Sequence, residues 1–136
     1  MKKLLFSTLS LIVVLIIYGC TDTNYLPLSG FYQSERTIDN YVIQISIQPD
    51  EKNFTEYIDN REVNSGTYDE LGDKKYKLIG VNQTIEIALE KNNSFEVIFK
   101  NLNDGNPIVM KYIDKVPVYY STEFDDIDKY KALIKD

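Results

Sequence analysis

The sequence contains no histidine, no tryptophan and a single cysteine among its 136 residues. The absence of His excludes a Ser-His-Asp triad, a His-based zinc site and an imidazole general base. One Cys allows neither an intramolecular disulfide nor a cluster of metal-binding thiolates. Acidic residues outnumber basic ones by 21 to 15, so the formal net charge is -6 and the chain lacks the Lys/Arg surface that nucleic-acid phosphates require. At this length we expect one domain.

The first twenty residues have the pattern of a secretory signal. A basic start at Lys2 and Lys3 is followed by an uncharged apolar run over residues 4–18, and then by Gly19 and Cys20. This run is shorter than the ~20 residues that a membrane-spanning helix needs. A basic region, an apolar region and a small residue before the cleavage point are typical of exported proteins. We therefore expect residues 1–19 to be a signal peptide.

The segment Ile17 to Cys20, with the sequence Ile-Tyr-Gly-Cys, resembles the lipobox of bacterial lipoproteins. This resemblance implies that the Cys20 thiol receives a diacylglyceryl group and that a dedicated peptidase cuts just before it. Two acyl chains anchor a protein stably, because each buried CH₂ contributes ~0.8 kcal/mol. We expect a lipid anchor at Cys20 in the cell membrane, on the extracytoplasmic side, with residues 20–29 as a lipidated tether. The alternative is an uncleaved amphiphilic anchor with an incidental Cys.

Cleavage before Cys20 would make the chain more acidic. It leaves 117 residues and removes Lys2 and Lys3, so 13 basic residues remain against 21 acidic ones and the formal charge becomes -8. Anionic lipid head groups repel such a surface, so the lipid and not electrostatic attraction must hold the protein at the membrane. The same charge suits a cationic partner.

The remainder of the sequence alternates apolar and polar residues with the period of two that half-buried strands show. The pattern is clearest over residues 41–47 and 85–90. Turn residues separate these runs; Asp104-Gly105 favours a hairpin, and Gly66 is an expected bulge. About eight short strands at roughly ten-residue spacing follow one another without helices between them, which excludes parallel βαβ folds. The pattern predicts an antiparallel up-and-down meander.

The end of the chain changes to the helical period. Apolar positions over residues 123–135 fall on one stripe, with acidic residues first and lysines last, which predicts one amphipathic helix. Closing a sheet removes its open edges. We therefore expect a mainly β fold in which about eight strands close into a small barrel with a C-terminal helix, as a single domain over residues 30–136. An open, strongly curved sheet wrapped on the helix is the alternative.

The start of the first expected strand, Gly30-Phe31-Tyr32, is similar to the Gly-x-Trp opening of lipocalins, with Tyr32 in place of Trp. The order of eight meandering strands and then a helix over residues 30–135 also resembles lipocalins and the wider calycin group. This resemblance implies a barrel whose mouth holds a small apolar ligand. In its many Ile, Lys, Asn and Tyr residues the chain also resembles small lipoproteins of AT-rich bacterial genomes, some of which protect the producing cell against its own bacteriocin.

Aromatic residues on the expected inward faces are candidates for a ligand pocket. Pockets are mostly apolar with a few polar groups, and a buried Tyr hydroxyl needs a partner that a solvated cavity supplies. The alternative is that these residues fill the core, because an eight-stranded barrel is just wide enough for its own side chains. The candidates are Tyr41, Phe54, Tyr76, Phe95, Phe99 and Tyr112.

Three polar clusters are weaker candidates. The aspartates within residues 125–128 could bind a hard cation but fit the first turn of a helix better. The Asn and Asp residues of 101–106 fit a hairpin. The densest charged cluster comprises Glu56, Asp59, Arg61 and Glu62. Two of its carboxylates could act as a general acid and a general base, although solvated charges in a turn are the simpler interpretation. We expect no metal and no cofactor.

These observations predict a non-enzymatic protein held at the membrane by its lipid. The first hypothesis is a binding module for a small apolar ligand or peptide, which requires a cavity of about 300 Å³ or more. The alternative is an interaction or immunity-type lipoprotein that binds a polypeptide through its outer surface, with a filled core and an exposed apolar patch. An enzyme would have to use carboxylates, Tyr or Lys alone.

Overall fold

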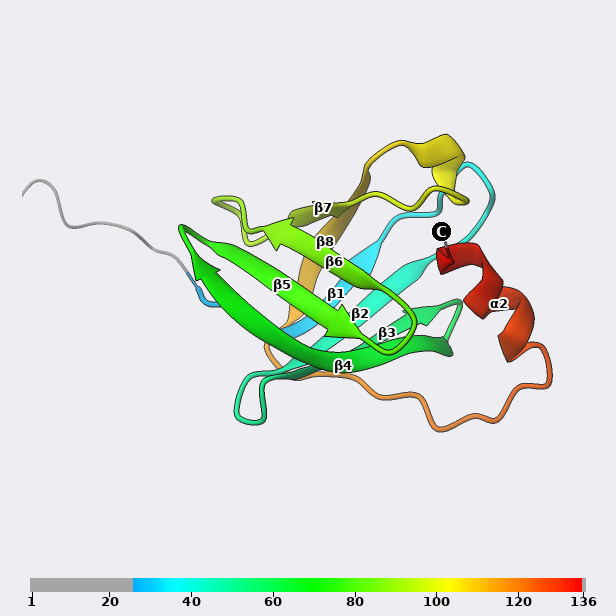
Figure 1. Cartoon of the computed structure of the whole chain (residues 1–136), viewed down its shortest axis with the longest axis horizontal. Helices are drawn as coiled ribbons and strands as arrows, with labels where there is room; N and C mark the ends of the chain where they lie inside the picture. The colour runs from blue at the N-terminus through cyan, green and yellow to red at the C-terminus, as the bar shows by residue number, and fades with distance from the viewer. Residues whose placement is uncertain (1–25, 136) are drawn as a thin grey trace, which may run out of the picture.

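The computed structural model describes residues 26–135 (Figure 1). The signal peptide expected over residues 1–19 and the lipidation expected at Cys20 lie outside these residues. These described residues form eight strands, one short 3-10 helix and one α-helix: β1 (Gly30–Ser34), β2 (Ile43–Gln48), β3 (Asn53–Ile58), β4 (Arg61–Gly72), β5 (Lys75–Gly80), β6 (Thr84–Ala88), β7 (Phe95–Val97), η2 (Asn103–Gly105), β8 (Ile108–Asp114) and α2 (Ile127–Ile134). Neither of these helices is long and apolar enough to cross a membrane.

The strands form one antiparallel sheet with the order β6-β5-β4-β3-β2-β1-β8-β7. Strands that are consecutive in sequence are therefore neighbours in space, and β8 returns to pair with β1. The edge strands β6 and β7 lie close to each other but are not paired as neighbouring strands of the sheet. The predicted up-and-down meander with a C-terminal helix is confirmed as a nearly closed barrel (Figure 1).

Period-two alternation explains the barrel interior. In β2 the side chains of Ile43, Ile45 and Ile47 are fully buried inside, while Gln44 and Ser46 point outward. The inward side chains of all the strands join in one apolar cluster. The chain enters β1 at one end of the barrel and α2 lies at the other (Figure 1). Leu28, just before β1, and Ile134 of α2 belong to the same cluster, and each is only 1% exposed. The interior is thus filled by the protein's own side chains.

Residues 115–126, here called the strap, run from β8 along the outer face of β2 and β3 to α2 (Figure 1). The N–H of Val118 donates to Ser46 Oγ at 3.0 Å, and the Ser46 hydroxyl donates back to the Val118 carbonyl. The ring of Tyr120 meets that of Tyr57 edge-on at 4.9 Å. Pro117 favours the edge of a sheet for this segment, but outward side chains of β2 and β3 bind the segment to the face of the sheet.

The helix begins at Ile127, four residues after the start that the sequence predicts. Arg61 explains the difference: its guanidinium holds the Asp126 carboxylate with two hydrogen bonds, of 3.0 and 3.1 Å. The same group lies 4.0 Å from the ring centre of Phe124 and 4.6 Å from that of Tyr130. These contacts hold the end of the strap against β4. The Arg61 hydrogen bond also lowers the pKa of Asp126.

Replacing Arg61 by Lys is expected to loosen the strap and α2 while leaving the barrel folded. An ammonium group cannot reproduce the paired hydrogen bonds to Asp126 or the contacts of the planar guanidinium with both aromatic rings. Hydrogen–deuterium exchange should therefore speed up over residues 115–134 and stay unchanged in β2 and β3. Replacing Lys111, whose ion pair with Glu35 is exposed, by Ala is the control. Equal acceleration throughout the barrel would contradict this role for Arg61.

Two local predictions also need correction. The bulge expected at Gly66 lies at Val63, because Glu56 pairs with Asn64 while Tyr57 pairs with Glu62. This bulge lets Val63 and Asn64, which are consecutive, both be buried. The strands on either side of Asp104-Gly105 do pair, as β7 and β8, but a longer connection over residues 98–107 contains η2 in place of a tight turn.

Candidate functional site

The six aromatic residues predicted to line a pocket lie at the barrel interior or its rim. Phe54, Tyr76, Phe95 and Phe99 are buried in the core cluster, whereas Tyr41 and Tyr112 are partly buried and pack against it. Sequence reasoning missed two further interior tyrosines, Tyr32 and Tyr68. Their rings contact the predicted ones: the centroids of Tyr32 and Phe95 are 4.9 Å apart, and those of Tyr68 and Tyr76 are 6.0 Å apart.

Buried tyrosine hydroxyls bind the chain where it enters the barrel. The hydroxyl of Tyr76 accepts a hydrogen bond from the N–H of Leu28, and that of Tyr32 accepts one from Ser29, each at 3.3 Å. Burial raises the pKa of Tyr32 to about 12. These tyrosine hydroxyls therefore find their hydrogen-bond partners in backbone N–H groups and not in a solvated cavity. The same hydrogen bonds hold Leu28 in place at the end of the barrel where the chain enters β1.

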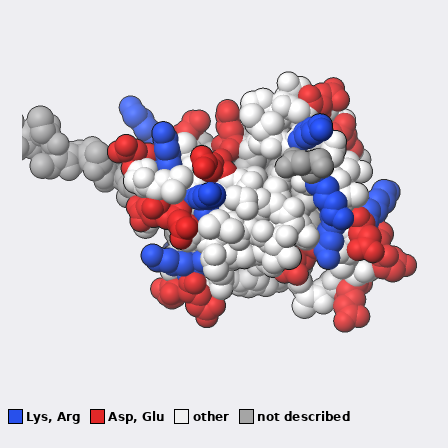
Figure 2. Space-filling view, in the orientation of Figure 1, with Lys and Arg blue, Asp and Glu red and all other residues white. Residues whose placement is uncertain are grey.

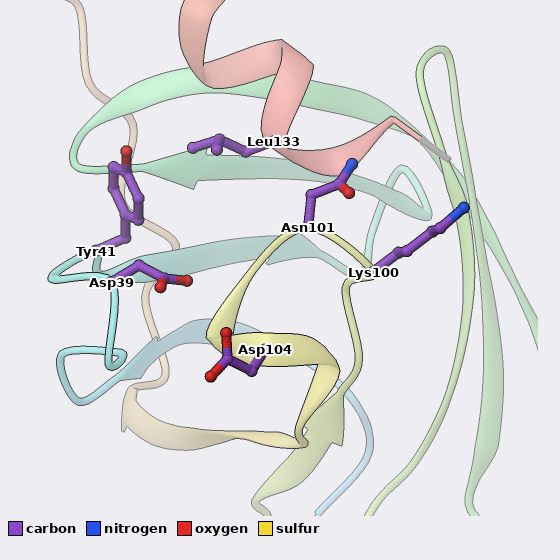
Figure 3. Close-up of a pocket in the computed structure, with 6 residues that line it drawn as sticks. All are labelled: Asp39, Tyr41, Lys100, Asn101, Asp104 and Leu133. Atoms are coloured by element: carbon purple, nitrogen blue, oxygen red, sulfur yellow. The ribbon is translucent and has the colours of Figure 1, made fainter.

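A hollow of about 570 Å³ lies at the rim under α2 (Figure 3). Two of its polar side chains already have partners: Asp39 accepts a hydrogen bond from the Asn103 N–H at 2.6 Å, and Asn101 donates to the Lys135 carbonyl at 2.7 Å. The side chain of Lys100 extends away from the other labelled residues (Figure 3). We assign this hollow to the packing of the rim loops against the helix.

Glu56 is the one charged residue among the buried side chains of residues 26–135. It lies on the inward face of β3 between Phe54 and Ile58, and it is fully buried. Its Oε2 accepts a hydrogen bond from Asn64 Nδ2 at 3.2 Å, whereas its Oε1 has no partner. Burial raises the pKa of Glu56 to about 7, against the smaller opposing effect of the Asn64 hydrogen bond. Near neutral pH this carboxyl is therefore only partly ionised.

Asn64 connects Glu56 to the turn between β5 and β6. Its side chain also donates to the Gln83 carbonyl at 2.9 Å and accepts from the Asn82 N–H at 3.0 Å. Gly80 makes room for this network, since a Cβ there would lie 2.1 Å from Asn64 Oδ1. The network satisfies Asn64 fully but leaves one oxygen of Glu56 unpaired.

The charged side chains predicted to cluster at residues 56–62 lie on different sides of the sheet and have different partners. Asp59 accepts a hydrogen bond from the Val42 N–H at 2.9 Å in the β3–β4 turn, and Arg61 binds Asp126. Glu62 points outward while Glu56 points inward, so these two carboxylates do not form an acid–base pair. The interpretation as solvated turn charges is wrong for Glu56 and Arg61 and holds for the exposed Glu62. Within residues 26–135, no cluster of three acidic side chains could hold a metal ion.

A groove lies between the strap and the outer face of β3 and β4, and we call it the strap groove. Its larger part has a volume of about 670 Å³. It is lined by Glu51, Asn53, Glu62, the exposed ring of Tyr119 and the hydroxyl side chains of Thr55, Ser65 and Thr67. Partial burial and the nearby Glu51 carboxylate raise the pKa of the Tyr119 hydroxyl. Its smaller part, of about 410 Å³, shares Glu62.

The smaller part extends the strap groove toward α2. Tyr120, Glu123 and Phe124 line it. Glu62 and Glu123 are exposed and form no ion pair with the described part of the chain. Figure 2 shows groups of acidic residues along the lower margin of the molecule, the side on which the strap runs in Figure 1. The strap groove therefore combines aromatic rings, hydroxyl groups and unpaired negative charge.

Exposed apolar side chains are spread over several elements. On β8, Lys111 separates Val109 from Ile113, and other exposed residues lie on loops, on β4 and on β5. Among the described residues these include Ile38, Leu71, Ile79, Val81, Ile98 and Val116. This dispersion favours recognition by charge and aromatic rings over recognition by one apolar patch.

Comparisons of the chain with protein-family models, with curated proteins and with solved structures gave no match. The function must therefore be argued from the geometry of the barrel and its surface.

Proposed function

We propose that this protein is a membrane-anchored, extracytoplasmic and non-enzymatic binding protein that holds a polypeptide through its outer face. The observation that carries this proposal is the filled barrel interior, which is closed by Leu28 at one end and by Ile134 at the other. The hollows of the strap groove lie outside the barrel. The acidic groove and the formal charge of the processed chain both favour a cationic partner.

A small apolar ligand inside the barrel is the competing proposal. The core aromatics Phe54, Tyr76, Phe95 and Phe99 would then have to move apart, because their side chains occupy the space that such a ligand needs. Entry would also require displacement of Leu28 or Ile134. The closed interior therefore supports the outer-face proposal more strongly.

Site-specific crosslinking in the host tests the outer-face proposal. Photoreactive p-benzoylphenylalanine is placed at Ile79, whose strand neighbour Thr67 lines the strap groove, or at Val109 on the outer face of β8. The two positions are matched, at 39% and 44% exposure. We expect a crosslinked polypeptide from Ile79 and none from Val109. Failure of every outer-face position to crosslink a polypeptide would contradict the proposal.

A further inference from the structure

The acidic side chains of the strap groove have a defined spacing along β3. The Glu51 carboxylate accepts a hydrogen bond from Asn53 Nδ2 at 2.9 Å, which places it beside the first residue of β3. Glu62 is the strand partner of Tyr57, four residues further along β3. At about 3.3 Å per strand residue, the two carboxylates are separated by about 13 Å along the groove.

Aromatic rings lie along the same groove. Tyr119 is 53% exposed and lines the part that contains Glu51, while Tyr120 lines the part beyond Glu62. Glu51 and Tyr119 line the same part of the groove. Glu62 is the strand partner of Tyr57, whose ring meets that of Tyr120 edge-on. An aromatic face close to a carboxylate favours a cation whose stem packs on the ring.

An extended peptide matches this spacing. A strand advances about 3.3 Å per residue, so side chains at positions i and i+4 lie about 13 Å apart and on the same side. Two basic residues at these positions can each meet one carboxylate. The hydroxyl groups of Thr55 and Ser65 lie between the two ends, on the outward face of the paired strands β3 and β4, and that of Thr67 lies level with Asn53.

We infer that the strap groove binds an extended segment of a basic polypeptide, with Lys or Arg at positions i and i+4 facing Glu51 and Glu62. This inference rests on the proposed function and names the chemistry of its partner. The strap supplies one wall of the groove through Tyr119, so removal of the strap from the sheet would remove the binding site as well.

Fluorescence anisotropy with the full chain in non-ionic detergent micelles tests the inference. The probe is a labelled nine-residue peptide of Ser and Thr with Lys at its third and seventh positions. Glu51→Gln and Glu62→Gln should each raise its Kd about three- to fivefold, and the double variant ~10-fold or more, as expected for exposed charge pairs. Glu86→Gln and Glu96→Gln, exposed residues of β6 and β7, make the same change of charge and should leave the Kd within about twofold.

A second peptide separates spacing from total charge. With Lys at its third and fourth positions it carries the same charge, and we expect weaker binding that is insensitive to Glu62→Gln. Equal binding of the two peptides, or equal losses in the Glu86 and Glu96 variants, would overturn the inference. If the double groove variant crosslinks the polypeptide from Ile79 as strongly as the natural chain does, the partner chemistry inferred here is wrong and the outer-face proposal stands. If no outer-face position crosslinks a polypeptide, the outer-face proposal itself fails.

Discussion

Replacing Glu56 by Gln is expected to stabilise the folded protein by about 3 kcal/mol above pH 7.5 and by almost nothing below pH 4.5. The reason is the position of this carboxyl inside the barrel, where its Oε1 has no hydrogen-bond partner. Gln keeps an oxygen that can accept the hydrogen bond from Asn64, and it cannot ionise. The variant therefore removes the cost of a buried charge without creating a cavity.

The direction of the pH effect follows from the two pKa values. The carboxyl of Glu56 has a pKa of 4.5 when exposed in the unfolded chain and about 7 in the folded barrel. Between these values the folded chain holds a proton that the unfolded chain has lost, so the free energy of unfolding falls as pH rises. The loss is complete above the folded pKa, and the difference from 4.5 to about 7 corresponds to about 3 kcal/mol.

Urea denaturation at several pH values measures this effect. Between pH 5.5 and 8.5 the difference in the free energy of unfolding between Glu56→Gln and the natural chain should widen by about 2 kcal/mol. The exposed Glu86→Gln of β6 serves as the control and should show no such widening. A constant difference across this range would show that Glu56 is not a neutral, buried acid in the fold.

The period-two pattern of β3 predicts the position of Glu56 correctly, whereas grouping it with its charged neighbours in the sequence does not. Phe54, Glu56 and Ile58 occupy alternate positions of one strand, so the apolar residues on either side already place the carboxyl inside. Grouping Glu56 with its charged sequence neighbours concealed this. The bulge at Val63 then brings Asn64 into the interior as its hydrogen-bond donor.

The strands and their order follow from the sequence because each hairpin is local. The run from Tyr41 to Ile47 and the turn residues after it specify a strand and its antiparallel neighbour without reference to distant parts of the chain. The strap is different. Its place depends on Ser46 and Tyr57, whose outward positions predict contact with solvent and which instead bind residues more than 60 positions away.

The strap groove could not be predicted from the sequence, because it too depends on contacts between distant parts of the chain. The aromatic residues proposed for a pocket were mostly placed inside the barrel correctly, but pattern alone cannot show whether an interior is open or filled. The strap groove joins Glu51 from a turn, Glu62 from β4 and Tyr119 from the strap. No short motif contains these three residues, so only the folded arrangement reveals them.

Replacing Cys20 by Ser is expected to abolish lipid attachment. Residue 20 lies outside the described structure, so this expectation rests on the resemblance of residues 17–20 to a lipobox. Without the thiol there is no diacylglyceryl group, and the cut that follows acylation should not occur. The intact mass of the variant should therefore retain residues 1–19, and labelling with radioactive palmitate should disappear. Two acyl chains contribute ~0.8 kcal/mol for each buried CH₂, so their loss is large.

Thr21→Ser is the matched control for this change, since it alters a neighbouring residue and leaves the thiol in place. It should be acylated and cleaved like the natural chain. If the natural chain carried no acyl group, or if Cys20→Ser were still labelled with palmitate, the proposed anchor and the extracytoplasmic location would both be wrong.

Native mass spectrometry of the full chain, purified from the membranes of its host in non-ionic detergent, tests most directly whether this filled barrel acts through its outer face. We predict a complex with a basic polypeptide and no apolar small molecule bound to the barrel. One apolar molecule retained per chain, with no polypeptide, would contradict the account.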